Sequence, residues 1–133
     1  MLAGAPPTLD LVVLPGNYAV ARLEPAASVP DWASHGTISS ITRTPDELSI
    51  VCADDAVPVG VRAERGWRAL RVAGTIDFAL TGILASILSP LGAARVSIFA
   101  VSTYDTDCVL VHAYALAPAV AALRAAGHRV QNA

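Results

Sequence analysis

The sequence predicts an α+β fold whose second half is a ferredoxin-like module, with the element order strand, helix, strand, strand, helix, strand (βαββαβ). Three observations predict it. Short apolar runs at strand spacing recur through the first half of the chain, a strongly periodic helix lies in the middle, and two strands and a second helix follow. The first half is rich in strands and poor in helices, so it either extends the same sheet or forms a reduced copy of the module.

The predicted elements of the first half begin with an apolar run, Leu9–Leu14, which ends at Pro-Gly-Asn and is followed by an alternating run, Tyr18–Leu23. This pattern predicts a β-hairpin. Prolines and serines make residues 24–36 typical of a loop, with one helical turn around Trp32.

Two further strands are expected on either side of a Thr-Pro-Asp turn, at Thr37–Arg43 and Glu47–Ala53. Residues 54–66 contain prolines, glycines and charges, and we interpret them as the connection between the halves. This divides the chain into a strand-rich module over residues 1–62 and a ferredoxin-like module over residues 63–133.

The second module starts with a strand at Trp67–Val72, followed by the clearest helix of the chain. Asp77 is a favoured N-cap residue and marks its expected start, and Gly92 marks its end. Its apolar residues recur at i, i+3, i+4, i+7, i+8 and i+11, which predicts one buried stripe: Leu80, Ile83, Leu84, Ile87, Leu88 and Leu91.

The remaining elements are two strands, a helix and a short closing strand. Arg95–Thr103 has the pattern of a buried strand, and Asp107–Ala113 that of a second one. Pro118 is a good first-turn residue for a helix that ends before Gly127, and His128–Gln131 adds the closing strand.

Composition excludes several classes of function. Of 133 residues, 54% are hydrophobic and 15% charged, which is ample for a buried core. The net charge of -2 and the scattered arginines argue against nucleic acid, because neutralising phosphates takes clusters of Lys and Arg. The start of the chain lacks the features of a secretory signal, and no run has the length of a membrane span. We expect a cytoplasmic protein.

A first candidate binding segment, Gly74-Thr75-Ile76-Asp77, lies between a strand and the start of the clearest helix. Exposed backbone N–H groups and the helix dipole favour an anion at such a position, for example a carboxylate. Asp77 adds a carboxylate of its own, so the turn suits a zwitterion. The alternative is that Asp77 only caps the helix, and the two roles can coexist.

A second candidate segment is the polar island Ser102–Asp107 between two apolar strands. Its residues are typical of a hairpin turn. In a binding role, Thr103 and Asp107 would offer a hydroxyl and a carboxylate, and Tyr104 would cover an apolar part of the ligand. Arg43 is a further candidate, because its planar guanidinium suits a carboxylate; an ion pair with a neighbouring acidic residue is an equal alternative.

The segments G-T-I-D-F, G-I-L-A-S-I-L-S-P-L and V-S-I-F-A-V-S-T-Y-D-T-D-C-V-L-V resemble the ACT domain family, the amino-acid-sensing regulatory modules of bacterial metabolism. They are most similar to the subgroup that includes the cytosolic arginine sensor of the CASTOR type. In the first half, R-T-P-D-E-L-S-I-V-C and L-P-G-N-Y-A-V-A-R-L resemble small bacterial proteins of that subgroup.

The resemblance implies two ACT-like modules in one chain, with an amino acid bound where strands and the loop-to-helix turn of neighbouring modules meet. The first half departs from the family pattern, because it lacks two good helices. Carried over by position, the candidate ligand-binding residues are Gly74, Thr75, Ile76, Asp77, Thr103, Tyr104 and Asp107.

No residue pattern indicates catalysis. The two cysteines are far apart and each lies in an apolar run, and the three histidines occupy unrelated settings. A nucleophile beside a base, or a metal cluster, is therefore not expected. We expect a binding module without catalytic residues, metal or cofactor, and a homodimer, because of the high apolar content. The alternative is a structural or protein-interaction module that dimerises and binds no small ligand.

Overall fold

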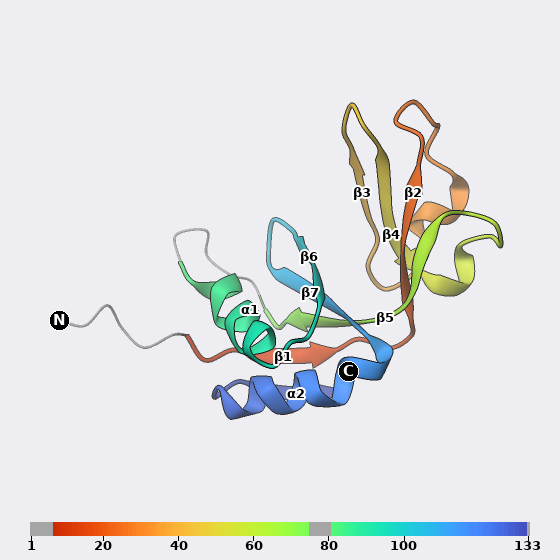
Figure 1. Cartoon of the computed structure of the whole chain (residues 1–133). Helices are drawn as coiled ribbons and strands as arrows, with labels where there is room; N and C mark the ends of the chain where they lie inside the picture. The colour runs from red at the N-terminus through yellow and green to blue at the C-terminus, as the bar shows by residue number, and fades with distance from the viewer. Residues whose placement is uncertain (1–6, 75–80, 133) are drawn as a thin grey trace. The chain divides into compact units, whose positions relative to one another are not determined.

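The computed structural model describes residues 7–74 and 81–132 (Figure 1). Two compact units make up the chain: a ferredoxin-like unit of residues 1–14 and 69–133, and a central unit, Pro15–Arg68. Strand β5 (Ala63–Val72) contributes its first part to the central unit and its last part to the ferredoxin-like unit. The expected boundary between residues 62 and 63 falls at the start of this shared strand.

The ferredoxin-like unit has the predicted βαββαβ order. After β5 come α1 (Ile83–Ala93), β6 (Ile98–Ser102), β7 (Asp107–His112), α2 (Leu116–Ala125) and β8 (Arg129–Asn132). A 3-10 turn, η3 (Ala113–Ala115), leads into α2. The prediction of this module from periodicity is confirmed.

Strand β1 (Asp10–Val13) is an added strand of this unit. It lies between β5, to which it is antiparallel, and β8, to which it is parallel. The expected hairpin with the next run is therefore wrong. That run, β2 (Tyr18–Leu23), pairs along its whole length with β4 (Leu48–Ala53) instead. The Pro-Gly-Asn segment thus links two strands that do not pair with each other.

The core of the ferredoxin-like unit lies between its sheet and the two helices. The predicted stripe of α1 supplies Ile87 and Leu91, which are 1% and 0% exposed, and Leu84 and Leu88 pack beside them. Leu123 of α2 faces the same cluster. The strands complete it with Leu11, Val13, Leu70, Val72, Val109, Val111 and Val130.

Helix α1 begins later than expected. Gly82, with φ of +75°, occupies the N-cap position, and the helix starts at Ile83. A left-handed residue cannot continue a right-handed helix, so the cap expected at Asp77 is wrong for α1. At the other end, the helix passes through Pro90 and ends at Ala93. No helix in the described part of the chain is long and apolar enough to span a bilayer.

The central unit is a small sheet with strand order β3-β4-β2-β5, where β3 is Ser40–Arg43. The Thr-Pro-Asp turn joins β3 and β4 as predicted, and its Thr44 hydroxyl accepts the N–H groups of Asp46 and Glu47 at 3.1 and 3.2 Å. The expected helical turn is η1 (Asp31–Ser34), and a second turn, η2 (Asp54–Ala56), follows β4. Leu48, Ile50, Cys52 and Val57 form part of its buried core.

Strand β6 differs from the expectation of a buried strand. In the described part of the chain it pairs with β7 alone, so it is an edge strand. Ile98, Phe99 and Val101 are half-buried, and Ala100 and Ser102 are exposed. Apolar composition alone does not separate a central strand from an edge strand, because each covers one face of the sheet.

Candidate ligand-binding site

The polar turn between β6 and β7 is closed by its own hydrogen bonds. The N–H of Thr103 donates to the carbonyl of Thr106 at 2.8 Å, and the Thr103 hydroxyl donates to the same oxygen at 3.0 Å. The N–H of Thr106 donates back to the Thr103 hydroxyl at 3.2 Å. The interpretation as a hairpin turn is confirmed, and the Thr103 hydroxyl is engaged within it.

Asp107 stands at the first position of β7, opposite Ser102 of β6. The Ser102 hydroxyl donates to Asp107 Oδ1 at 2.7 Å, a distance typical of a hydroxyl bound to a carboxylate. Within the described residues, Asp107 Oδ2 accepts no hydrogen bond. This oxygen remains available to a ligand.

Thr106 joins the polar turn to the end of β5. Its hydroxyl donates to the carbonyl of Val72, the last residue of that strand, at 2.8 Å. Gly74 follows two residues later with φ of +80°, and the space where its Cβ would stand is open. The structure therefore brings the Thr103–Asp107 turn beside the chain that leads into Gly74. Sequence reasoning did not single out Thr106, because a hydrogen bond between residues 34 positions apart leaves no local signal in the sequence.

Three of the predicted site residues, Thr75, Ile76 and Asp77, lie outside the described residues, so their binding role stays a prediction. Tyr104 is 80% exposed at the turn. Its expected contact with an apolar part of a ligand also stays a prediction.

Arg43 holds a loop of its own unit. Its guanidinium donates through Nη1 to the carbonyl of Pro25 and through Nη2 to that of Ala27, the latter at 2.9 Å. These contacts tie the loop after β2 to the end of β3, and they involve backbone carbonyls rather than Asp46 or Glu47. The observed contacts give Arg43 a structural role within the central unit.

Both cysteines are buried and free. Burial raises the pKa of the Cys108 thiol to about 11, and burial also raises that of Cys52. A thiol that stays protonated at neutral pH is a poor nucleophile and a poor metal ligand. Among the described residues, no group of three or more His, Cys, Asp or Glu side chains is arranged to hold a metal ion.

Two family models match the chain, and one of them covers the turn between β6 and β7. Residues 62–125 match the ACT domain, and residues 16–60 match a separate model described as an N-terminal domain. Residues 62–125 therefore form an ACT domain. The ACT match runs from the start of β5 to the end of α2, so it contains Gly74 and the Thr103–Asp107 turn.

Several solved structures are similar to this chain over most of its length. An Agobacterium tumefaciens protein is 42% identical, with a TM-score of 0.90, and the alignment covers 96% of this chain and 95% of that one. A Vibrio cholerae protein, described as a possible transport protein, is 17% identical with a TM-score of 0.72, covering 90% of each chain. The regulatory subunit of Thermus flavus aspartate kinase is 12% identical with a TM-score of 0.59, covering 92% and 99%. The last two share the fold of this chain. A comparison with curated proteins found no match.

Proposed function

We propose that this ACT protein is an amino-acid-sensing regulatory module without catalytic activity. The observation that carries the proposal is the hydrogen bond from Thr106 to the carbonyl of Val72, because it places the polar turn beside the entry to Gly74. The ACT match and the likeness in fold to an aspartate kinase regulatory subunit support it. A cytoplasmic homodimer, close to the CASTOR-type sensors, is part of the proposal.

In the proposed site, the two charges of an amino acid meet different groups. We assign the ligand's carboxylate to backbone N–H groups of Thr75–Asp77, which lie outside the described residues and before the start of α1 at Ile83. Asp107 Oδ2, which accepts no hydrogen bond within the described residues, faces the ammonium group, and Asp77 adds a second carboxylate. A zwitterion therefore suits the site better than a simple anion does.

A thermal-shift screen with each of the twenty amino acids tests the proposal. A ligand that binds only the folded state raises its stability by about 2.7 kcal/mol at 100 times its Kd. We expect one amino acid, or a small group of related ones, to raise the melting temperature at millimolar concentration. If none does, the proposed function is wrong.

Two substitutions in the β6–β7 turn separate binding from folding. Asp107→Asn keeps an acceptor for Ser102 but removes the charge, so we expect the affinity for the amino acid to fall about tenfold or more. Asp105→Asn, at an exposed position of the same turn, is the matched control and should bind normally. Equal affinities of the two variants for the amino acid would show that Asp107 does not bind the ligand.

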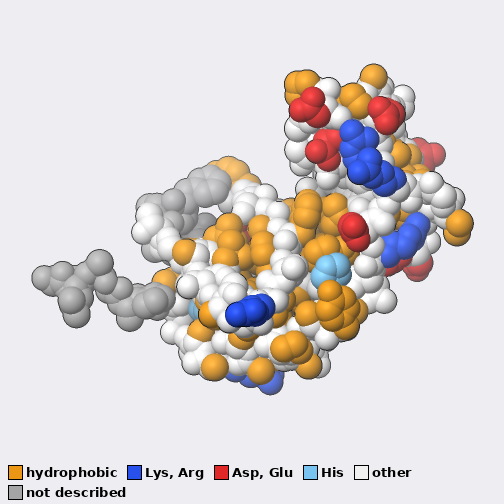
Figure 2. Space-filling view, in the orientation of Figure 1, with side chains coloured by type: hydrophobic (Ala, Val, Ile, Leu, Met, Phe, Trp, Pro, Cys, Tyr) orange, Lys and Arg blue, Asp and Glu red, His pale blue; other side chains and the backbone are white. Residues whose placement is uncertain are grey.

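A second candidate function is a protein-interaction module that dimerises without a ligand. The half-buried apolar side chains of edge strand β6 favour it, because an exposed strand edge is a template for pairing with another chain. Figure 2 shows that hydrophobic side chains cover much of the visible face of the ferredoxin-like unit, whereas charged ones gather on the central unit. Light scattering of wild type and Val101→Lys measures the oligomeric state. If the substitution abolishes a dimer, and no amino acid raises the melting temperature of the wild type, the second candidate is favoured.

A further inference from the structure

We propose that the central unit holds a second small-molecule site, which binds a small primary amine. An open pocket of about 510 Å³ lies among three segments, Pro15–Tyr18, Gly36–Thr37 and Ala53–Asp55. Pockets of about 300–1,000 Å³ are the usual size for small ligands. None of these residues belongs to the site proposed above.

The walls of this pocket are tied together by backbone hydrogen bonds. The N–H of Ala53 donates to the carbonyl of His35 at 2.8 Å, and the N–H of Asp54 donates to that of Asn17 at 3.0 Å. Gly36 packs tightly here: a Cβ at this position would lie 3.0 Å from the carbonyl oxygen of Ile38. Backbone hydrogen bonds therefore hold the three segments of the lining together.

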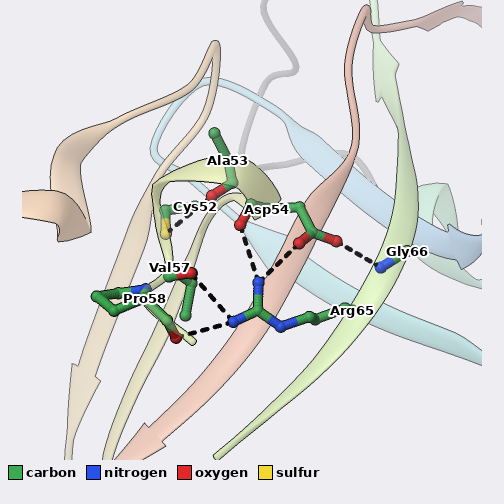
Figure 3. Close-up of polar contacts among 7 residues, drawn as sticks. All are labelled: Cys52, Ala53, Asp54, Val57, Pro58, Arg65 and Gly66. Atoms are coloured by element: carbon green, nitrogen blue, oxygen red, sulfur yellow. Dashed lines mark hydrogen bonds and ion pairs between the residues drawn. The ribbon is translucent and has the colours of Figure 1, made fainter. Parts of the chain in front are cut away.

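Asp54, which lines the pocket, is held in place by Arg65 and Gly66 (Figure 3). Arg65 Nη1 donates to Asp54 Oδ1 at 2.9 Å, and Asp54 Oδ2 accepts the N–H of Gly66 at 2.7 Å. Arg65 Nη2 donates to the carbonyls of Val57 and Pro58, both at 3.0 Å. Both oxygens of Asp54 are thus engaged, and the charge of Asp54 is balanced by that of Arg65.

Asp55 supplies the remaining charge of the lining. It is exposed, and its carboxylate has no hydrogen bond or ion pair within the described residues. The side chains of Asn17 and Thr37 likewise have no hydrogen bond there, and no arginine lines the pocket. The lining therefore carries about one net negative charge and two neutral hydrogen-bonding groups.

This lining selects the chemical class of the ligand. A carboxylate or phosphate would meet the charge of Asp55 with no cation to offset it, whereas an ammonium group gains a charge-assisted hydrogen bond. Pro15 and Ala53 offer apolar contacts to a short carbon chain, beside the buried Tyr18. A primary amine on a short aliphatic chain fits both features.

The test uses three ligands of one chain length at constant pH: butylamine, butyrate and butanol. Amide resonances of the full-length protein are followed by two-dimensional NMR. We expect butylamine alone to cause saturable shifts at Asn17, Thr37 and Asp55. Butyrate shifts of equal size, or no saturable shift with butylamine, would overturn the proposal.

Three charge substitutions complete the test. Asp55→Asn should weaken butylamine binding at least tenfold. Asp46→Asn is the matched control, because it removes an exposed carboxylate of the same unit from outside the pocket. If both weaken binding equally, the amine responds only to surface charge and the site is not real. Asp107→Asn should leave butylamine binding unchanged, so this proposal and the amino-acid site can fail independently.

Discussion

His128 Nε2 donates a hydrogen bond to the carbonyl of Ser86, in the first half of α1, at 2.8 Å. Pro90 stands four residues after Ser86 and has no N–H, so this carbonyl lacks its helical partner. The other ring nitrogen, Nδ1, accepts the N–H of Leu9 at 3.0 Å, which assigns the proton of the neutral ring to Nε2. His128 is buried, at 5% exposed, and its two hydrogen bonds join α1 to the segment that leads into β1.

We expect His128→Phe to lower the free energy of unfolding by about 2–4 kcal/mol, because two backbone groups lose their partner while the volume is roughly kept. Urea unfolding measures the loss. His35→Phe changes an exposed histidine and is the control. Equal stabilities of wild type and His128→Phe would contradict the bridging role.

Pro90→Ala tests the link between the proline and the histidine. Alanine supplies an N–H to the Ser86 carbonyl, so His128→Phe should cost about 1 kcal/mol less in this background than in the wild type. A double-mutant cycle of unfolding free energies gives this coupling. A coupling of zero would show that the Ser86 bond does not contribute to stability.

Gly36→Ala should destabilise the chain by about 2–3 kcal/mol. Its φ is +116°, and the new Cβ would approach the Ile38 carbonyl oxygen to 3.0 Å and the Ala53 nitrogen to 3.1 Å. Gly60 is the control position, because its φ is also positive, at +95°, but the space around an added Cβ is open. A substitution there introduces backbone strain without crowding. Thermal unfolding should show a smaller loss for Gly60→Ala, about 1 kcal/mol; equal losses would mean that crowding at Gly36 is unimportant.

Arg65→Lys should cost about 1–3 kcal/mol, because an ammonium group cannot reproduce the fork that binds Asp54 and two carbonyls at once. Chemical denaturation measures it. Arg62→Lys, at an exposed position before β5, is the control and should change little. A tolerated Arg65→Lys would show that a single charge suffices here.

Cys108 should make stability fall at alkaline pH. Its pKa rises through burial from 9.0 to about 11, so between these values the unfolded chain releases a proton that the folded chain keeps. Its contribution is complete below pH 9 and declines by up to about 2–3 kcal/mol as the pH reaches 11. The difference in unfolding free energy between wild type and Cys108→Ala should shrink over that range. A constant difference would contradict the raised pKa.

Local patterns were enough to predict most elements and the order of the ferredoxin-like module. The stripe through Ile87 and Leu91, the Thr-Pro-Asp turn and the short β8 each follow from residues close together in the chain. The start of α1 was missed, because Asp77 is a good N-cap by residue type, whereas the left-handed conformation of Gly82 makes that residue the N-cap.

The candidate site was predictable only in part. The polar turn was recognisable from composition, but the hydroxyl that joins it to β5 belongs to Thr106, and that contact spans 34 residues. Arg43 has the right chemistry for a ligand, yet the nearby loop carbonyls bind it. Whether an arginine binds a ligand or nearby backbone carbonyls depends on distances in the folded chain. Residue types alone do not give those distances.

By itself, the sequence determined which segments form strands and helices, because hydrophobic periodicity and turn residues act over a few positions. Tertiary structure alone decided that β1 lies between β5 and β8 and that β6 is an edge. It also decided that His128 donates a hydrogen bond to the Ser86 carbonyl, which lacks its usual helical partner because Pro90 has no N–H. Each of these features depends on residues that are distant in the chain. The hydrophobic pattern of a strand indicates that it is buried, but it does not indicate which other strand or helix lies beside it.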